Sequence, residues 1–190
     1  MINRELLTVQ EMYAADAATI EAGVSGESLM EAAGASVVGE ILSRWPAGQV
    51  AVLCGPGNNG GDGFGIAQLL QEAGWQVRLG LLGAIEDLKG DAAVMAGRWT
   101  GSCEPLSTAV ITEADVIVDA IFGAGLCRDV EGAAAETLRA VAANPAPCVA
   151  VDIPSGVSGD TGKIHGYAAS ATLTVTFFRA KPGHYLMPGR

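Results

Sequence analysis

Residues 55–65 read Gly55-Pro56-Gly57-Asn58-Asn59-Gly60-Gly61-Asp62-Gly63-Phe64-Gly65, and they lie between an apolar run and a segment with helical periodicity. The first six residues match the G-x-G-x-x-G pattern of dinucleotide-binding turns, which by itself is a weak indication. Asp62 does not suit a turn that only cradles phosphate, because a carboxylate repels phosphate unless a cation lies nearby. We therefore predict a ligand-binding loop that places polar groups for chemistry or for cation binding.

Short apolar runs and helical segments alternate after residue 49, and this alternation predicts the fold. Because the runs are apolar on both faces, they indicate a parallel sheet that is covered on both sides. Two further helices are predicted near the N-terminus, each from the spacing of a capping box, at Thr8 to Glu11 and at Ser28 to Glu31. We expect a Rossmann-like, three-layer α/β/α sandwich with a mostly parallel central sheet and two N-terminal helices, in one domain over residues 1–190. The predicted strands are 50–53, 77–82, 116–118, 148–151 and 173–177, and the later helices lie near 62–73, 89–99 and 130–143.

Composition narrows the classes of partner. The chain has 190 residues, of which 49% are hydrophobic, so it can bury a sizeable core. Its formal net charge of −10 and the absence of a basic cluster disfavour nucleic acid or an anionic membrane as partner. The first residues lack the apolar run of a signal peptide and no segment reaches the length of a membrane span, so we expect a cytoplasmic protein. Cysteines are scattered without a C-x-x-C pair, which favours buried, reduced thiols at Cys54, Cys103, Cys127 and Cys148.

Carboxylates follow three of the predicted strands. Asp62 lies in the loop after the first, Asp119 ends the third and Asp152 ends the fourth. A single aspartate at such a position is often a helix cap or a turn former. Because ligands of open parallel sheets bind beyond the carboxyl ends of the strands, three together predict one shared site.

A cation is expected at this site, because three carboxylates repel one another and an anionic nucleotide would add to the repulsion. Oxygens of Asn59, Asp119 and Ser155, together with backbone carbonyls, suit a hard ion, whereas no His or Cys cluster favours zinc or copper. One carboxylate among neutral oxygens favours a weakly bound monovalent ion.

Few cationic side chains are available for a ligand phosphate. Backbone amides of the Gly123–Asp129 loop could hold one, with Arg128 inside that loop and Lys181 as a second candidate. An ordinary solvated surface charge is an equally open reading of both. His165 and His184 are isolated in the sequence, and we predict no catalytic role for either.

Four segments together resemble the NAD(P)H-hydrate epimerase family, the YjeF N-terminal domain. They are Gly55 to Gly63, Val118-Asp119-Ala120-Ile121-Phe122-Gly123-Ala124-Gly125, Val151-Asp152-Ile153-Pro154-Ser155-Gly156-Val157 and Lys181-Pro182-Gly183-His184. The N-terminal Leu29-Met30-Glu31-Ala32-Ala33-Gly34 also fits, although the family usually has Asn where Ala32 stands and Thr where Ala124 stands. The resemblance implies an isomerase of nucleotide repair that interconverts the R and S forms of hydrated NADH and NADPH, so that a dehydratase specific for S can restore the cofactor.

The resemblance also implies site residues. Potassium would be bound by Asn59, Asp119 and Ser155. The damaged nucleotide would contact Asn58, Asn59, Gly60, Gly61, Asp62, Gly123, Ala124, Gly125, Leu126, Cys127, Arg128, Asp129 and Asp152.

The chemistry required is general acid and base catalysis at the ring carbon that carries the hydroxyl. We predict Asp152 as the general acid, since a carboxylate beside a partly closed cavity can have its pKa raised, and Asp62 as the reserve. The dehydratase could follow Arg190 in a fused chain, and the apolar N-terminal helices could pair two protomers into a homodimer.

Two other functions, a non-catalytic binding domain and a dehydrogenase, are considered for this fold. A non-catalytic nucleotide-binding or scaffold domain of the same fold would keep the cavity without turnover, but the three aspartates speak against it. A nicotinamide-dependent dehydrogenase would need an acidic residue at the end of the second strand, and there the sequence has Leu82-Gly83.

Overall fold

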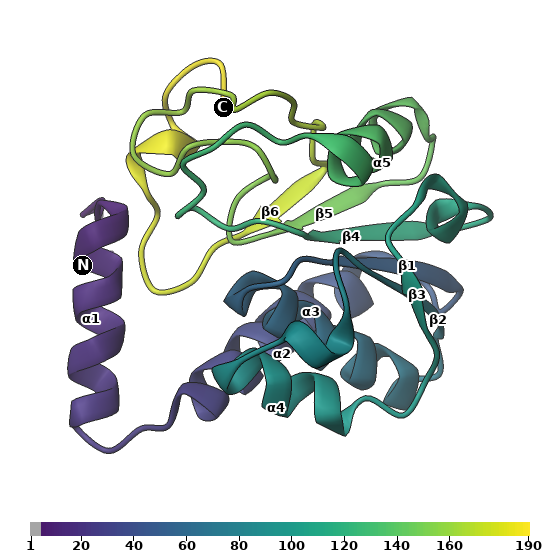
Figure 1. Cartoon of the computed structure of the whole chain (residues 1–190), viewed down its shortest axis with the longest axis horizontal. Coiled ribbons are helices and arrows are strands. Elements are labelled where there is room, and N and C mark those ends of the chain that lie inside the picture. The colour runs from purple at the N-terminus through teal and green to yellow at the C-terminus, as the bar shows by residue number, and fades with distance from the viewer. Residues whose placement is uncertain (1–4) are drawn as a thin grey trace.

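A six-stranded parallel sheet forms the centre of the molecule (Figure 1). The structure is a computed structural model that describes residues 5–190, so Met1 to Arg4, part of the stretch read above for a signal peptide, lie outside it. The strand order β3-β2-β1-β4-β5-β6 reverses direction between β1 and β4, which makes that point the topological switch. The strands are β1 (Gln49–Cys54), β2 (Gln76–Leu81), β3 (Cys103–Pro105), β4 (Val116–Ala120), β5 (Cys148–Val151) and β6 (Leu173–Val175).

The five predicted strands are confirmed, and β3 was missed. It has three residues, ends in a proline and pairs with β2 at the edge of the sheet, so it carries no apolar run that the sequence could reveal. The register places Cys54 beside both Leu81 and Ala120, so the ends of the three central strands lie side by side.

Helices cover both faces of the sheet, as predicted. On one face α2 (Gly26–Arg44), α3 (Asn58–Glu72) and α4 (Gly90–Arg98) pack together, and α5 (Gly132–Ala143) covers the other (Figure 1). Each face has its own apolar cluster: Phe64, Ile41 and Val118 lie in the first, and Leu138 and Ile117 in the second. Three short 3₁₀ turns, η1 (Ile85–Asp87), η2 (Thr108–Ile111) and η3 (Pro182–His184), complete the connections.

The glycine-rich loop turns into α3 four residues earlier than predicted, at Asn58. Its glycines serve close packing: a Cβ at Gly60 would lie 1.9 Å from the Gly55 carbonyl oxygen, and one at Gly63 would lie 2.7 Å from Cys54 Sγ. Helix α3 can therefore begin directly on the end of β1.

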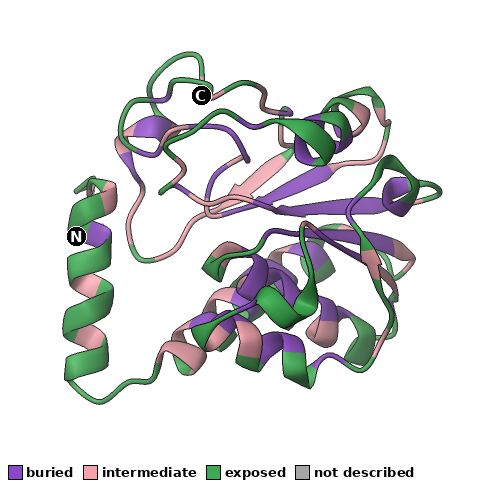
Figure 2. Cartoon of the chain, viewed as in Figure 1, coloured by how far each residue is buried: buried purple, intermediate pink, exposed green. Residues whose placement is uncertain are grey.

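The first helix, α1 (Val9–Glu21), stands apart from the three layers. It is exposed along most of its length, with Met12 buried (Figure 2). Its capping box is confirmed, since Thr8 Oγ1 accepts from the Glu11 N–H at 3.2 Å and Glu11 Oε2 accepts from the Thr8 N–H at 2.8 Å. The second predicted box is wrong: Ser25 caps α2 by accepting from the Ser28 N–H, because Ser25 is the last residue with extended backbone.

The structure also bears on the expectations for membrane spans and for the cysteines. Among residues 5–190, no helix has the length and apolar character needed to cross a bilayer. Cys54 and Cys148 are buried, and burial raises the pKa of both thiols. Cys103 and Cys127 are exposed, which corrects the prediction of four buried thiols.

Candidate active site

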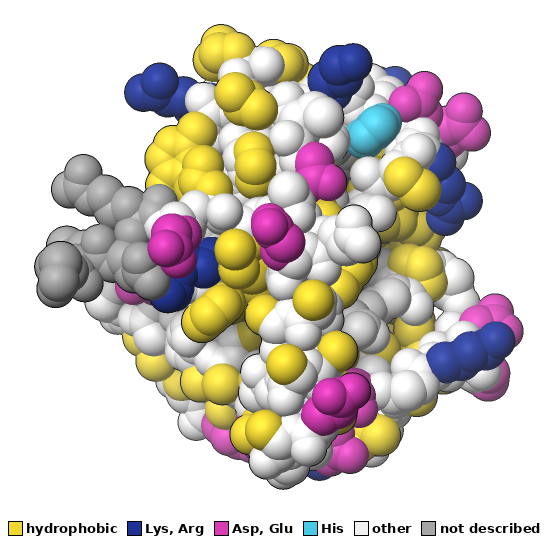
Figure 3. Space-filling view, turned by 90° about the vertical axis from the view of Figure 1, so that its left-hand side faces the viewer, with side chains coloured by type: hydrophobic (Ala, Val, Ile, Leu, Met, Phe, Trp, Pro, Cys, Tyr) yellow, Lys and Arg dark blue, Asp and Glu magenta, His cyan; other side chains and the backbone are white. Residues whose placement is uncertain are grey.

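A cavity of about 870 Å³ opens at the carboxyl ends of the strands, on the side from which α1 projects. Figure 3 looks onto that side, where exposed hydrophobic side chains are interspersed with acidic ones. One wall comes from α1 and α2 and is largely apolar, and the other comes from the glycine-rich loops after β1 and β4. Polar side chains of the lining are Tyr13, Asp16, Ser36, Asn58, Asn59, Asp62, Asp91, Arg128, Asp152, Thr176 and Lys181.

Most of the predicted substrate-binding residues lie in this lining. They are Asn58, Asn59, Asp62, Gly123, Ala124, Gly125, Leu126, Arg128 and Asp152. Gly60 and Gly61 are instead buried inside α3, where side chains would clash with neighbouring atoms. Asp129 lies beside a separate cavity of about 250 Å³, which Arg128 also borders, and Cys127 lines neither of these two cavities.

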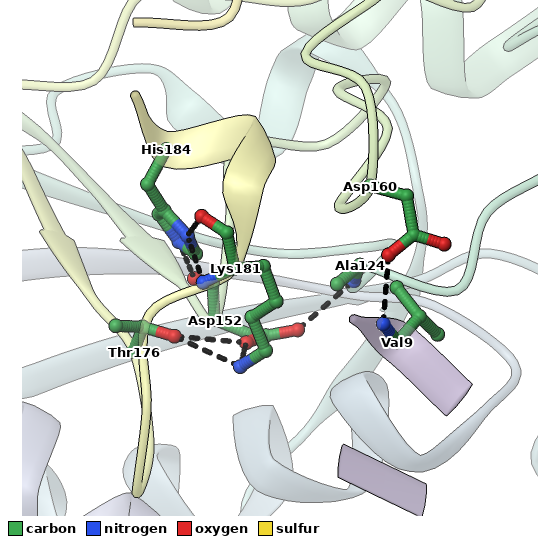
Figure 4. Close-up of polar contacts among 7 residues, drawn as sticks. All are labelled: Val9, Ala124, Asp152, Asp160, Thr176, Lys181 and His184. Atoms are coloured by element: carbon green, nitrogen blue, oxygen red, sulfur yellow. Dashed lines mark hydrogen bonds and ion pairs between the residues drawn. The ribbon is translucent and has the colours of Figure 1, made fainter. Parts of the chain in front are cut away.

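Asp152 lies directly after β5 and is held by donors on both carboxylate oxygens (Figure 4). Lys181 Nζ lies 2.6 Å from Oδ1, Thr176 Oγ1 donates to Oδ1 at 3.2 Å, and the Ala124 N–H donates to Oδ2 at 2.9 Å. All three partners donate, so both carboxylate oxygens of Asp152 act as acceptors. Ala124 makes this contact through its backbone N–H, so having alanine where the family usually has threonine does not affect the contact.

Lys181 has neither of the two settings considered from the sequence, a phosphate-binding cation or a solvated surface charge. Its side chain is 4% exposed, and Nζ is bound by Asp152 and, at 2.9 Å, by Thr176 Oγ1. It is therefore neither a solvated surface charge nor the free phosphate-binding cation that its position suggested. A buried lysine that contacts a carboxylate in a cavity marks this pair as a candidate functional group.

Asp62 is a carboxyl of this site whose surroundings disfavour its charged form. Burial raises its pKa well above the ordinary value, and the negative charges of Asp152 and Asp16 raise it further. A group in this state can donate a proton near neutral pH. Asp62, which the sequence reading kept as the reserve, is thus in surroundings that suit a general acid.

Asp16 and Tyr13 are site residues that sequence reasoning missed. Both lie on the face of α1 that lines the cavity. Burial raises the pKa of Asp16, and Asp152 adds to this while Lys181 opposes it, so Asp16 faces the same charges as Asp62. The helical spacing of Val9, Tyr13, Asp16 and Ile20 marks a shared face, but no local pattern shows that this face meets the sheet edge.

Asp119 and Ser155 lie behind the cavity wall and are almost fully buried. Ser155 donates to Asp119 twice, from its hydroxyl to Oδ1 at 2.6 Å and from its N–H to Oδ2 at 2.9 Å. Burial raises the pKa of Asp119, and the hydrogen bonds from Ser155 oppose that rise. Of the three carboxylates expected to share one cavity, Asp62 and Asp152 line it, whereas Asp119 lies outside the lining and supports the loop beneath.

Asn59 lies near Asp152. A Cβ at Gly123 would lie 3.2 Å from Asn59 Oδ1 and also 3.2 Å from Asp152 Oδ2, which puts the amide near the Asp152 carboxylate. The Asn59 Nδ2 is buried and has no hydrogen-bond partner within the part of the chain that the structure describes. Buried amide donors normally have partners, so this one points to a ligand with a hydrogen-bond acceptor beside it.

The sequence was compared with known proteins. Residues 26–183 match the pattern of the family described as YjeF-related protein N-terminus. The chain belongs to this family. The resemblance noted in the sequence is thereby confirmed for this YjeF-related domain.

The names of individual relatives agree with this family. The domain is 41% identical to NAD(P)H-hydrate epimerase of Rhodobacter capsulatus, with 95% of this chain and 91% of that protein covered, and 40% identical to the epimerase of Limosilactobacillus fermentum, with 96% and 89% covered. It is 38% identical to the bifunctional NAD(P)H-hydrate repair enzyme Nnr of Coxiella burnetii, of which it spans 35%. The fold is that of the crystal structure of yeast ynu0, YNL200c, at a TM-score of 0.81 and 22% identity over 95% of this chain and 83% of that one.

Proposed function

We propose that this protein interconverts the R and S forms of hydrated NADH and NADPH. Relatives about 40% identical over nearly the whole chain carry the name NAD(P)H-hydrate epimerase. The observation that carries the proposal is the Asp152–Lys181 pair at the strand ends, in a cavity that also holds a carboxyl of raised pKa. A cavity of about 870 Å³ also has the size of a small-molecule site.

The proposed chemistry uses the carboxyl groups of Asp62 and Asp152, which both line the cavity. The Asp62 carboxyl protonates the hydroxyl on the carbon next to the ring nitrogen, the C–O bond breaks, and water leaves as the nitrogen lone pair forms a C=N bond. Water then adds to the opposite face of that carbon and gives its proton to the Asp152 carboxylate. Exchange with solvent returns the two groups to their starting states, so no co-reactant is consumed.

Potassium is the cation that we propose for the site, with Asn59, Asp119 and Ser155 as its protein ligands. The donor set fits, because it offers one carboxylate with neutral oxygens. Asn59 would bind the ion through Oδ1, since its unpartnered Nδ2 is a hydrogen-bond donor and needs an acceptor instead. The bound ion would offset the negative charge of Asp119 and stabilise the loops that form the cavity.

We further propose that the S product passes to a dehydratase. The relative from Coxiella burnetii is a bifunctional repair enzyme in which the matched segment is about a third of the chain. The cytoplasmic location and the homodimer predicted from the sequence stay predictions.

The decisive experiment incubates the purified protein with one epimer of hydrated NADH and follows the R to S ratio by chromatography. We expect the ratio to equilibrate much faster than in buffer, and faster with potassium than with tetramethylammonium at equal ionic strength. Asp119→Asn should remove the potassium response. Binding of the hydrate without any acceleration would instead favour the non-catalytic alternative, and an equal rate in both salts would overturn the potassium site.

A further inference from the structure

The turn Lys181-Pro182-Gly183-His184 contacts Asp152 at two places (Figure 4). Lys181 Nζ lies 2.6 Å from the carboxylate, and His184 Nε2 lies 2.8 Å from the backbone carbonyl oxygen of the same residue. One turn thus holds both the side chain and the backbone of the proposed catalytic base.

The hydrogen bonds of His184 define its tautomer. The backbone N–H of Lys181 donates to Nδ1 at 2.9 Å, so Nδ1 is the acceptor. The proton of the neutral ring is then on Nε2, which donates to the Asp152 carbonyl. The contacts form a closed ring that runs from the Asp152 carboxylate through Lys181 and His184 back to the Asp152 backbone.

Asp152 needs such support because its backbone is in the left-handed region, with φ +66°. That conformation is unfavourable for a residue with a side chain, and it persists where neighbouring contacts enforce it. Its own N–H is bound to the Val175 carbonyl of β6 at 2.8 Å, so the strand fixes one side of the residue and His184 fixes the other.

The turn itself is fixed to the body of the protein. The Gly183 N–H donates to the Gly159 carbonyl at 2.6 Å, and a Cβ at Gly183 would lie 2.2 Å from the Ser158 carbonyl oxygen. The close approach explains why this position is glycine. Because the turn has little freedom, it can transmit a defined position to Asp152.

We propose that His184 is a positioning residue, which holds Asp152 in its left-handed conformation and keeps Lys181 against the carboxylate. The proposal rests on the proposed epimerase function for its kinetic consequences. It assigns a role to the Lys-Pro-Gly-His motif, whose histidine the sequence had given none.

Three variants separate the two hydrogen bonds of the ring. His184→Gln places an amide N–H near the position of Nε2, His184→Asn places an oxygen near that of Nδ1, and His184→Leu removes both. We expect kcat of the leucine variant to fall on the order of a hundredfold, as misplacement of a reacting group by about 1 Å does, with KM little changed. The glutamine variant should recover more of kcat than the asparagine variant, because it retains the contact to Asp152.

The matched control is His165→Asn. His165 is the other of the two histidines in the chain, and its Nδ1 lies 3.9 Å from Asp129 Oδ1. It should retain wild-type kcat. Equal, wild-type kcat in all three His184 variants that remain folded would overturn the positioning role.

A structural measurement keeps this test separate from the epimerase assay. A crystal structure of His184→Leu should show Asp152 outside the left-handed region or Lys181 displaced from its carboxylate, whether or not the wild-type protein has activity. An unchanged Asp152 in that structure would overturn the proposal, whereas an inactive wild-type protein would overturn only the proposed function.

Discussion

The carboxylate of Asp160 accepts a hydrogen bond from the backbone N–H of Val9, with 2.8 Å between Oδ1 and nitrogen (Figure 4). Val9 is the first residue of α1, and Asp160 lies in the loop between β5 and β6, so the contact joins the two ends of the chain. The Leu7 N–H adds a second link to the Ala180 carbonyl at 3.1 Å. Because α1 carries Tyr13 and Asp16, this anchor decides where one wall of the cavity lies.

Asp160→Ala should therefore loosen α1 more than the rest of the protein. The substitution removes an acceptor from the exposed first turn, a change of about 1 kcal/mol. We expect faster hydrogen exchange in α1 and a several-fold rise in KM for the hydrate, with kcat less affected. Asp115→Ala is the matched control. Asp115 also accepts from a backbone N–H at 2.8 Å, that of Gln49, but this contact lies at the start of β1, at the opposite end of the strand from the cavity. If the two variants show the same hydrogen exchange in α1 and the same KM for the hydrate, α1 is held in place by other contacts.

Asp62→Asn should change how stability depends on pH. Asp62 has a raised pKa in the folded state, so between 3.8 and that raised value the folded protein binds more protons than the unfolded chain. The stability of the wild type then falls as pH rises through the folded pKa, whereas the asparagine variant lacks this contribution. Thermal denaturation from pH 4 to pH 8 should show the variant gaining Tm relative to the wild type as pH rises. A constant difference would show that Asp62 ionises normally.

Asp152→Asn should lose on the order of a hundredfold or more in the rate of epimerisation, as the loss of a general acid or base does. The asparagine still has a carbonyl oxygen for the Lys181 and Thr176 contacts, so circular dichroism should show a retained fold. Near-normal turnover by this variant would move the role of the base to solvent water.

Two glycines of the loop after β1 should respond in opposite ways to alanine. A Cβ at Gly55 would lie 1.7 Å from the Ile121 carbonyl oxygen, whereas one at Gly57 would meet nothing within 4 Å. Because backbone must shift in the first case, we expect Gly55→Ala to lose about 1–3 kcal/mol or more of unfolding free energy. Gly57→Ala should stay within about 1 kcal/mol of the wild type, since it changes an N-cap residue in open space. Urea denaturation of both variants measures the difference, and equal losses would contradict this reading of the loop.

The local patterns of the sequence were sufficient for the parallel layers. The apolar runs of β1 and β4 are buried on both faces, and this burial is what makes them continuous in the sequence. Strand β3 was not predictable in this way, because an edge strand of three residues buries too little apolar surface to leave a pattern. The cap of α2 was misplaced by three residues, because serines at positions 25 and 28 both suit that role locally.

The sequence by itself determined the sheet, the helices on its faces and the gathering of aspartates at the strand ends, because hydrophobic periodicity and parallel topology are encoded locally. Only the tertiary structure decided what each charge does. In the folded protein Lys181 is buried against Asp152, and Asp119 lies behind the cavity wall. Burial raises the pKa of Asp62, and α1 places Asp16 in the site. Burial and distance between charges depend on segments far apart in the chain, and no local pattern contains them.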